Sequence, residues 1–306
     1  MVFKLVWVYA KNRSPSSLYT PVRIVFAKVC QAQGVQWKEE EVPDGLGSKI
    51  HWVGDLNTDK LILYFHGGGY YLPPDEGHVK FLIDCQSKLF DAGHAVNLAM
   101  LEHSLTPEAH YPTQPTQAMA ALQAVLHKGY LPSNIVIGGD SGGGNLALAV
   151  LSIINHPTNP FSTLQLDEPL RGAFLISPWV SFSVRSQSFR ENAGKDFLND
   201  GLILEWAEAY APSPVRDGYS EPLRNDEGWW RGLPAKAVLI LAGGDEVFCD
   251  DIQELGQRMA ESGTPTTMVT CPNHSHEECI QDAKTGLAAG PMASSVWEWL
   301  ALQFES

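Results

Sequence analysis

A serine flanked by glycines is the strongest chemical signal in this sequence. The run GDSGGG at 139–144 fits the pattern GxSxG and lies between a predicted strand and a predicted helix. Glycines on either side allow the sharp turn on which a serine oxygen projects from the carboxyl edge of a sheet. This context predicts Ser141 as a nucleophile and Asp140 as a residue that serves the turn. Because GxSxG is short, a glycine-rich turn that binds phosphate is the alternative.

A run of three glycines, HGGGY at 66–70, follows another apolar strand. Successive glycines let backbone N–H groups converge on one point, where they can stabilise the oxyanion of a tetrahedral intermediate. Each such donor is worth about 3 to 4 kcal/mol. We expect the N–H groups of Gly68, Gly69 and Gly142 to form this oxyanion hole. A flexible loop with a structural histidine is the alternative, and the serine turn downstream disfavours it.

Acids and bases for such a serine follow the later strands. A nucleophilic serine needs a general base, and the base needs a carboxylate that orients it. The segment GGDEVFCDD offers Asp245 and Glu246, and the segment HSHEE offers His274 and His276. The order serine, acid, histidine along the chain is that of α/β-hydrolases. A metal site at the two histidines is disfavoured because no third or fourth ligand is evident nearby, so we expect no metal and no cofactor.

These residues need a parallel sheet flanked by helices to bring them together. Short β-rich runs alternate with helical patterns, which is typical of an α/β fold, and apolar runs such as LILYF favour a sheet covered on both faces. Strands are predicted at 49–53, 61–65, 95–100, 134–138, 172–177, 237–242 and 266–270. Helices are predicted at 77–92, 115–128, 142–155, 250–262 and 291–304.

Two regions interrupt this alternation. The predicted division is an N-terminal segment that contributes to a cap, a cap insert rich in aromatic residues, and a catalytic domain in two pieces: 1–48, 181–233, and 49–180 with 234–306. In the N-terminal segment, 21–33 is predicted to form one helix. In the insert, Asn199 or Asp200 is predicted to cap a helix at 201–211.

Three ordered motifs resemble the hormone-sensitive-lipase-like branch of the α/β-hydrolases. HGGGY and GDSGGG flank the phrase SLTPEAHYP at 104–112, as the corresponding motifs do in that family. The resemblance runs from about Lys49 to the C-terminus and is closest to fungal esterase-like members, in which a phrase similar to IHWVG at 50–54 precedes the HGGG strand. It implies an α/β-hydrolase fold, with a mostly parallel central sheet and a helical cap, and the activity of a serine carboxylic-ester hydrolase.

The resemblance also bears on the choice of acid and base. Family members commonly carry an acid, three residues, then Asp and a further acidic residue, and EVFCDD beginning at Glu246 fits this phrase without a gap. Asp245 fits only with one inserted residue, yet aspartate is the more usual family acid, so Asp245 stays the rival. The residues after the base in this family favour His276 over His274. We therefore expect Ser141, Glu246 and His276 to be the catalytic residues.

The expected reaction is hydrolysis of a carboxylic ester or lactone of a small to medium apolar substrate through an acyl-enzyme. Fungal relatives often act in natural-product pathways of secondary metabolism, so a lyase, transacylase or cyclisation step on the same fold is the second hypothesis. A catalytically silent binding protein is the third, and the retained serine, histidine and glycines disfavour it. Tyr70 and Trp179 are expected to line the pocket. Trp206 is a further substrate-binding candidate, with packing of the cap against the body as the alternative.

Composition excludes several classes of partner. Lys and Arg total 21 against 35 Asp and Glu, so the net charge is −14 and nucleic acid is not an expected partner. No stretch approaches the roughly 20 apolar residues of a membrane span, and the apolar run at 2–10 is short and interrupted by Lys4. Five cysteines without CxxC spacing indicate free thiols in a reducing compartment. We expect a cytoplasmic enzyme that acts on a small-molecule ester, with a homodimer left open.

Overall fold

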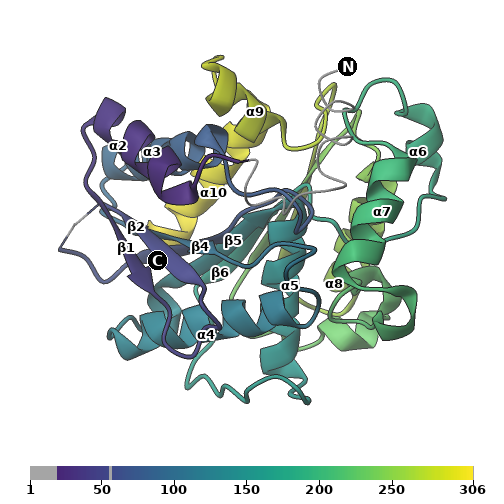
Figure 1. Cartoon of the computed structure of the whole chain (residues 1–306), viewed down its shortest axis with the longest axis horizontal. Helices are drawn as coiled ribbons and strands as arrows, with labels where there is room; N and C mark the ends of the chain where they lie inside the picture. Colours follow the sequence, from purple (N-terminus) through teal and green to yellow (C-terminus); the bar gives the residue numbers. More distant parts are fainter. Residues whose placement is uncertain (1–18, 55–56, 306) are drawn as a thin grey trace.

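An eight-stranded sheet forms the centre of the molecule (Figure 1). The computed structural model describes residues 19–54 and 57–305. The strand order is β1-β2-β4-β3-β5-β6-β7-β8, and only the pairs that involve β1 or β2 are antiparallel. The strand bounds are Trp37–Glu41 (β1), Lys49–Val53 (β2), Leu61–Phe65 (β3), Asn97–Glu102 (β4), Ile135–Asp140 (β5), Gly172–Ile176 (β6), Val238–Gly243 (β7) and Thr266–Cys271 (β8). The predicted α/β fold with a mostly parallel sheet is confirmed.

The strands from β2 to β8 coincide with the runs predicted from the sequence, to within two residues at each end. The edge strand β1 was not predicted. Its sequence WKEEE is charged, and its side chains are exposed or only half-buried. A strand with one neighbour and little burial does not need apolar residues, so apolar patterning does not reveal it.

Helices cover both faces of the sheet (Figure 1). One layer consists of α2, α3, α9 and α10, with bounds Val22–Gln33, Glu76–Asp91, Glu278–Thr285 and Pro291–Glu305. The other consists of α4, α5 and α8, with bounds Thr113–His127, Ser141–Asn155 and Cys249–Glu261. The short helix α9 was not predicted, whereas the other six agree with the predicted helices.

The central strand β3 shows how the two layers share the sheet. Leu61, Leu63 and Phe65 pack in the hydrophobic cluster with α4, α5 and α8, whereas Ile62 and Tyr64 pack in the cluster with α2, α3, α9 and α10. All five side chains are fully buried. Because successive strand residues point to opposite faces, an uninterrupted apolar run satisfies both layers at once. The predicted burial on both faces is confirmed.

The segment 181–233 connects β6 to β7 and forms the side of the molecule where α6 and α7 lie (Figure 1). Its helical elements are α6 (Gln187–Glu191), α7 (Asp200–Tyr210), η3 (Ser213–Val215), η4 (Pro222–Arg224) and η5 (Glu227–Trp230). Asn199 is the N-cap of α7, where its side chain accepts a hydrogen bond from the N–H group of Leu202. Trp206 and Tyr210 lie one turn apart on α7 and are both buried.

The described part of the N-terminal segment packs with the body of the molecule. Helix α2 contacts α3, β1 and β2, and β1 extends the sheet at its edge. The apolar run at 2–10 lies outside the described residues. Within the described chain, the helices are all too short or too polar to cross a bilayer.

Candidate active site

The predicted nucleophile lies on a strained turn between β5 and α5. Ser141 has a φ of 47°, a left-handed conformation that costs a residue other than glycine about 1 to 3 kcal/mol. Glycines make the turn feasible, since a side chain at Gly143 would overlap the carbonyl oxygen of Phe65 and one at Gly139 would overlap the carbonyl of Gly143. The predicted strand, sharp turn and helix around Ser141 are therefore present.

The glycine run after β3 lies beside this turn because β3 and β5 are neighbours, with Phe65 paired to Gly139. Gly68 and Gly69 have φ values of 96° and 60°, which favour glycine at both positions. A methyl group added at Gly142 would lie 3.3 Å from the backbone nitrogen of Gly69. The structure thus brings together two of the predicted oxyanion donors, one from each loop.

The predicted base and its acid meet after β7 and β8. His276 Nδ1 lies 3.1 Å from Glu246 Oε2, and both side chains are buried. The rival Asp245 forms instead an ion pair with Lys195, with 2.9 Å between Oδ1 and Nζ, at the surface. His274 is half-exposed, and its Nδ1 lies 3.0 Å from the carbonyl oxygen of Pro272. Between the two candidates for each role, the geometry favours Glu246 and His276.

The other ring nitrogen of His276 faces a second carboxyl group. His276 Nε2 lies 3.5 Å from Glu277 Oε1. Within the described part of the chain, no hydrogen bond joins the Ser141 hydroxyl to His276. Burial disfavours the histidine cation, whereas a negative charge on Glu277 and the carboxylate of Glu246 raise the pKa of His276. Burial likewise raises the pKa of Glu246, against the opposing effect of His276.

Ser177, just after the end of β6, binds the backbone of the residue that follows the base, and sequence reasoning missed it. Its hydroxyl accepts a hydrogen bond from the N–H group of Glu277, at 3.2 Å. It is fully buried and has a φ of 46°. Its position directly after a parallel strand, at the edge that carries the other site residues, was the signal available in the sequence.

The Asp140 side chain contacts buried residues behind the serine turn. Its side chain forms no capping hydrogen bond to α5. It accepts instead a hydrogen bond of 2.6 Å from the Tyr64 hydroxyl, and its Oδ2 lies 3.3 Å from His78 Nε2. The pKa of the Asp140 carboxyl is held well below its usual range: burial opposes ionisation, but His78, Glu277 and Tyr64 together overcome it. Asp140 is thus a buried anion behind the serine turn.

Comparisons with known proteins agree with this geometry. The family model described as alpha/beta hydrolase fold matches residues 62–280. An acetyl-hydrolase of Streptomyces hygroscopicus is 31% identical over 228 residues, which cover 74% of this chain and 70% of that protein. The chain belongs to the hormone-sensitive-lipase-like α/β-hydrolases. It is a carboxylic-ester hydrolase, as the predicted resemblance implied.

Further relatives of this hydrolase have related names. An esterase of Acinetobacter venetianus is 26% identical over 283 residues, covering 86% of each chain. A putative steryl acetyl hydrolase of Schizosaccharomyces pombe is 27% identical over 233 residues, covering 71% of this chain and 58% of that one. Among solved structures, an esterase of the bacterial hormone-sensitive lipase family has a TM-score of 0.72, with 24% identity and coverage of 94% and 95%. Its likeness supports the fold.

Two of the residues expected to bind substrate in this hydrolase are deeply packed. Tyr70 stacks on Tyr210 with 3.7 Å between ring centroids and donates a hydrogen bond of 2.6 Å to Asn145 Oδ1. Trp179 packs against Phe182 and is also buried. Both rings are therefore packed in the interior, where they contact other side chains.

Trp206 and Phe197, both from the segment 181–233, lie nearer to the predicted chemistry. The Trp206 ring covers Gly69 so closely that a side chain there would overlap it. The Phe197 ring makes an edge contact with His276, with 5.7 Å between ring centroids, and is 44% exposed. The segment thus places one aromatic ring beside the glycine run and another beside the imidazole. Phe197 was not predicted, because several phenylalanines of the insert are equivalent in the sequence alone.

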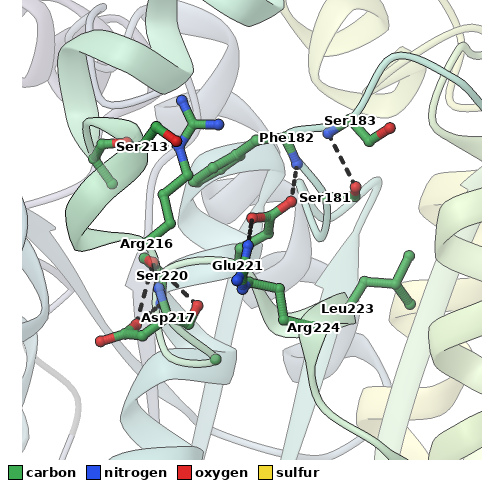
Figure 2. A network of polar contacts seen from close by, with 12 residues as sticks. Ser181, Phe182, Ser183, Ser213, Arg216, Asp217, Ser220, Glu221, Leu223 and Arg224 are labelled. Carbon is green, nitrogen blue, oxygen red and sulfur yellow. Dashed lines mark hydrogen bonds and ion pairs between the residues drawn. The ribbon is translucent and has the colours of Figure 1, made fainter.

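A polar network fastens this segment to the hydrolase body. Asn145, on the helix that begins at Ser141, donates hydrogen bonds to the backbone oxygens of Trp179 and Ser220. Asp217 accepts hydrogen bonds from the Ser220 backbone and, at 2.7 Å, from the Tyr111 hydroxyl. Figure 2 shows the adjoining part, in which Glu221 accepts the N–H group of Phe182 and pairs with Arg224. We call Asn145, Asp217, Ser220 and Glu221 the insert network.

One group of three potential metal ligands exists among the described residues, and it is remote from the serine turn in the fold. Glu39, His51 and Glu102 come from β1, β2 and β4, with ligand atoms within 4.8 Å of one another. The Lys49 ammonium lies 2.8 Å from Glu39 Oε1, and His51 Nε2 lies 2.6 Å from Glu102 Oε2. These contacts satisfy the carboxylates within the protein itself.

Proposed function

We propose that this esterase works through a serine acyl-enzyme, with Ser141 as nucleophile, His276 as base and Glu246 as orienting acid. The observation that carries the proposal is the contact of 3.1 Å between His276 Nδ1 and Glu246 Oε2, at the sheet edge that carries the strained Ser141 turn. Adjacent parallel strands supply these residues, since β5, β6, β7 and β8 follow one another in the sheet. This arrangement supports the same division of roles as in other serine hydrolases.

Each residue has one step in the proposed reaction. Ser141 Oγ attacks the acyl carbonyl while its proton passes to His276 Nε2, and Glu246 accepts the Nδ1–H group and stabilises the imidazolium. The N–H groups of Gly68, Gly69 and Gly142 hold the oxyanion of the tetrahedral intermediate. His276 returns the proton to the leaving alcohol. Water then attacks the acyl-enzyme by the same sequence of proton transfers.

We further propose the division into a body at 49–180 with 234–306, a cap at 181–233, and an N-terminal segment at 1–48 whose described part packs with the body. The cap narrows the site, because Trp206 lies on Gly69 and Phe197 beside His276. A ring packed against an oxyanion donor leaves little room for a long acyl chain beside it. The acetyl-hydrolases among the relatives agree with a short acyl group. We therefore propose a short acyl group, on an otherwise small to medium apolar substrate.

We also propose a cytoplasmic location. What supports this proposal is that all five cysteines are buried as free thiols, which is typical of proteins in a reducing compartment. Separation of cell fractions, with immunodetection of the native enzyme, tests this proposal directly. Recovery of the enzyme from the secreted fraction would contradict it.

The serine mechanism is tested by Ser141→Ala in an assay with p-nitrophenyl esters of graded chain length. Wild-type enzyme is expected to favour acetate and butyrate, to be inactivated by an organophosphate, and to be unaffected by EDTA. Ser141→Ala should lose both turnover and covalent labelling. Ser183→Ala, at an exposed serine of the insert, is the matched control and should keep both. Labelling that persists in Ser141→Ala would move the nucleophile to another residue.

A further inference from the structure

A second buried carboxyl group lies where the catalytic proton must pass. Glu277 Oε1 is 3.5 Å from His276 Nε2, the nitrogen that takes the Ser141 proton in the proposed mechanism. The Glu277 backbone has a φ of 53° and is held by the Ser177 hydroxyl, so the side chain is directed inward and is only 6% exposed. An ionised carboxylate at this position would pair with a proton on Nε2. The imidazole would then be unable to accept a proton from serine.

The Glu277 carboxyl also lies beside that of Asp140. Glu277 Oε1 and Asp140 Oδ2 converge on the space above Gly67, where any side chain would overlap them. Both oxygens are buried, and neither has a hydrogen-bond partner among the described residues. Two negative charges on buried carboxyl groups that converge in this way are strongly disfavoured, so one of the two groups keeps a proton. The pair therefore holds one proton.

The surroundings decide which carboxyl keeps that proton. Asp140 accepts a hydrogen bond from the Tyr64 hydroxyl. His78 lies between two carboxylates, with its Nε2 at 3.3 Å from Asp140 Oδ2 and its Nδ1 at 3.1 Å from Asp75 Oδ1. Burial opposes a cation at His78, but Asp140 and Asp75 raise its pKa well above the usual value, so His78 is protonated. Both contacts stabilise Asp140 as the anion. Burial and the Asp140 charge then raise the pKa of Glu277 well above its usual range.

The result is a row of titratable side chains that runs from the surface to the catalytic centre and ends in two neighbouring carboxyl groups. Lys284 Nζ lies 2.6 Å from Asp75 Oδ2, and the row continues through His78 and Asp140 to Glu277. We call these five residues the charge row. The other titratable neighbours of Glu277 are Tyr64, whose hydroxyl is protonated, and the buried thiol of Cys279 in α9, whose pKa burial raises. His276 and, beyond it, Glu246 complete its surroundings.

We propose that the Asp140 anion keeps a proton on Glu277 and so leaves His276 Nε2 free to act as the base, which makes Asp140 and Glu277 positioning residues for the catalytic proton. The inference rests on the proposed function of His276. The competing arrangement has the same number of protons, with Glu277 ionised and His276 charged. A negative charge at Asp140 disfavours that arrangement, because it would place two anions in contact.

Removal of the Asp140 charge should move the proton. In Asp140→Asn, Glu277 ionises and His276 becomes an imidazolium between two carboxylates. Loss of a free base predicts a fall in kcat/KM on the order of 10²- to 10⁴-fold at pH 7. The rising limb of the pH profile should move to higher pH than in the wild type, because a negative charge on Glu277 raises the pKa of His276. Adding Glu277→Gln removes the second anion. The double variant should therefore have a kcat/KM at least about tenfold higher than that of Asp140→Asn.

The decisive measurement is the protonation state of His276, read from its ¹⁵N NMR shifts in histidine-labelled enzyme at pH 7 and assigned with His276→Gln. We expect neutral imidazole in the wild type, imidazolium in Asp140→Asn, and neutral imidazole again in Asp140→Asn/Glu277→Gln. The matched control Asp140→Asn/Glu278→Gln alters the next carboxylate, which binds the backbone of Ser275, and should give no rescue.

Two outcomes would overturn the inference: neutral His276 in Asp140→Asn, or a double variant with the same His276 state and activity as Asp140→Asn. Melting curves identify variants that fail to fold. If Asp140→Asn fails, His78→Gln provides the same test, since it removes the cation that keeps Asp140 ionised. A wild-type enzyme that turns over no ester would contradict the proposed function alone, because the NMR measurement needs no turnover.

Discussion

The charge row and the insert network are both polar and reach into the buried interior, yet they are built from different groups. The row contains titratable side chains, with the exposed Lys284 at its surface end and Glu277 at the catalytic end. The insert network contains an amide, a hydroxyl and two carboxylates that mostly bind backbone groups, as with Asn145 and Trp179. A change in the row redistributes protons, whereas a change in the network leaves buried donors and acceptors without partners.

This difference predicts that substitutions in the two networks have different effects on turnover and on stability. Variants of the row and of the residues it touches should lose turnover while they keep most of their stability. Variants of the insert network should lose stability while the molecules that stay folded remain active. Measurements of kcat and of unfolding on the same variants therefore test the comparison.

The largest effect is expected next to the row, at Glu246. Glu246→Gln removes the charge that orients and stabilises His276, and kcat should fall on the order of ten-thousandfold, by analogy with the neutralised acid of other triads. Asp245→Asn is the control, because Asp245 pairs with Lys195 at the surface, and it should cost less than about tenfold. Steady-state kinetics and a melting curve for each variant give the ranking. The reverse ranking would assign the orienting role to Asp245.

A smaller effect, on stability, is expected in the insert network at Asn145. Asn145→Ala leaves the Tyr70 hydroxyl and the backbone oxygens of Trp179 and Ser220 without their partner, which predicts a loss of about 3 kcal/mol in the free energy of unfolding. Asn155→Ala, at a less buried position of the same helix, should cost about 1 kcal/mol. Urea unfolding measures both. A drop in kcat beyond tenfold with unchanged stability would contradict the separation of the two networks.

The smallest effect is expected at Asp251, a buried carboxyl that belongs to neither network. Burial raises its pKa to about 7, so the folded state binds the proton more tightly than the unfolded state. Ionisation therefore costs stability, and the cost grows from about pH 4 to pH 7 and is constant above. Asp251→Asn should raise the free energy of unfolding by about 1 to 2 kcal/mol at pH 8 and leave it unchanged at pH 4.

Urea unfolding at the two pH values checks this sign. Asp250→Asn is the matched control, because Asp250 accepts the N–H group of Ser188 and gains nothing from becoming neutral. An increase in the stability of Asp251→Asn at pH 4 as large as that at pH 8 would mean that the benefit does not come from the charge.

The sequence predicted the parts of the fold that depend on local patterns. Continuous apolar runs revealed β2 to β8, and glycine spacing revealed both loops beside Ser141. The edge strand β1 has no such pattern, and α9 follows the left-handed Glu277 without a side-chain cap. Burial and glycine patterns therefore explain why these strands and loops were predicted. The lack of such a pattern in β1 and of a side-chain cap at α9 explains why those two elements were missed.

For the candidate site, motif order predicted the residues that follow each strand, but not the contacts between strands. Glu246 and His276 are 30 residues apart, and only the sheet brings them together. Ser177 and His78 were missed because their importance comes from neighbours on other elements. Glu277 was interpreted only as part of a motif around His276. Its contact with Asp140 depends on the pairing of distant loops, for which a single sequence carries no signal.

The connection from β6 to β7 has a consequence for exchanging caps among related enzymes. The two strands are parallel neighbours, so the chain leaves the carboxyl end of β6 and must re-enter at the opposite edge of the sheet. Its second half, with η4 and η5, makes this return along α8. A graft that replaces all of 181–233 would remove the returning chain segment together with the part of the cap that covers the site. The modular unit for transplantation is the first half alone, from the end of β6 through α7.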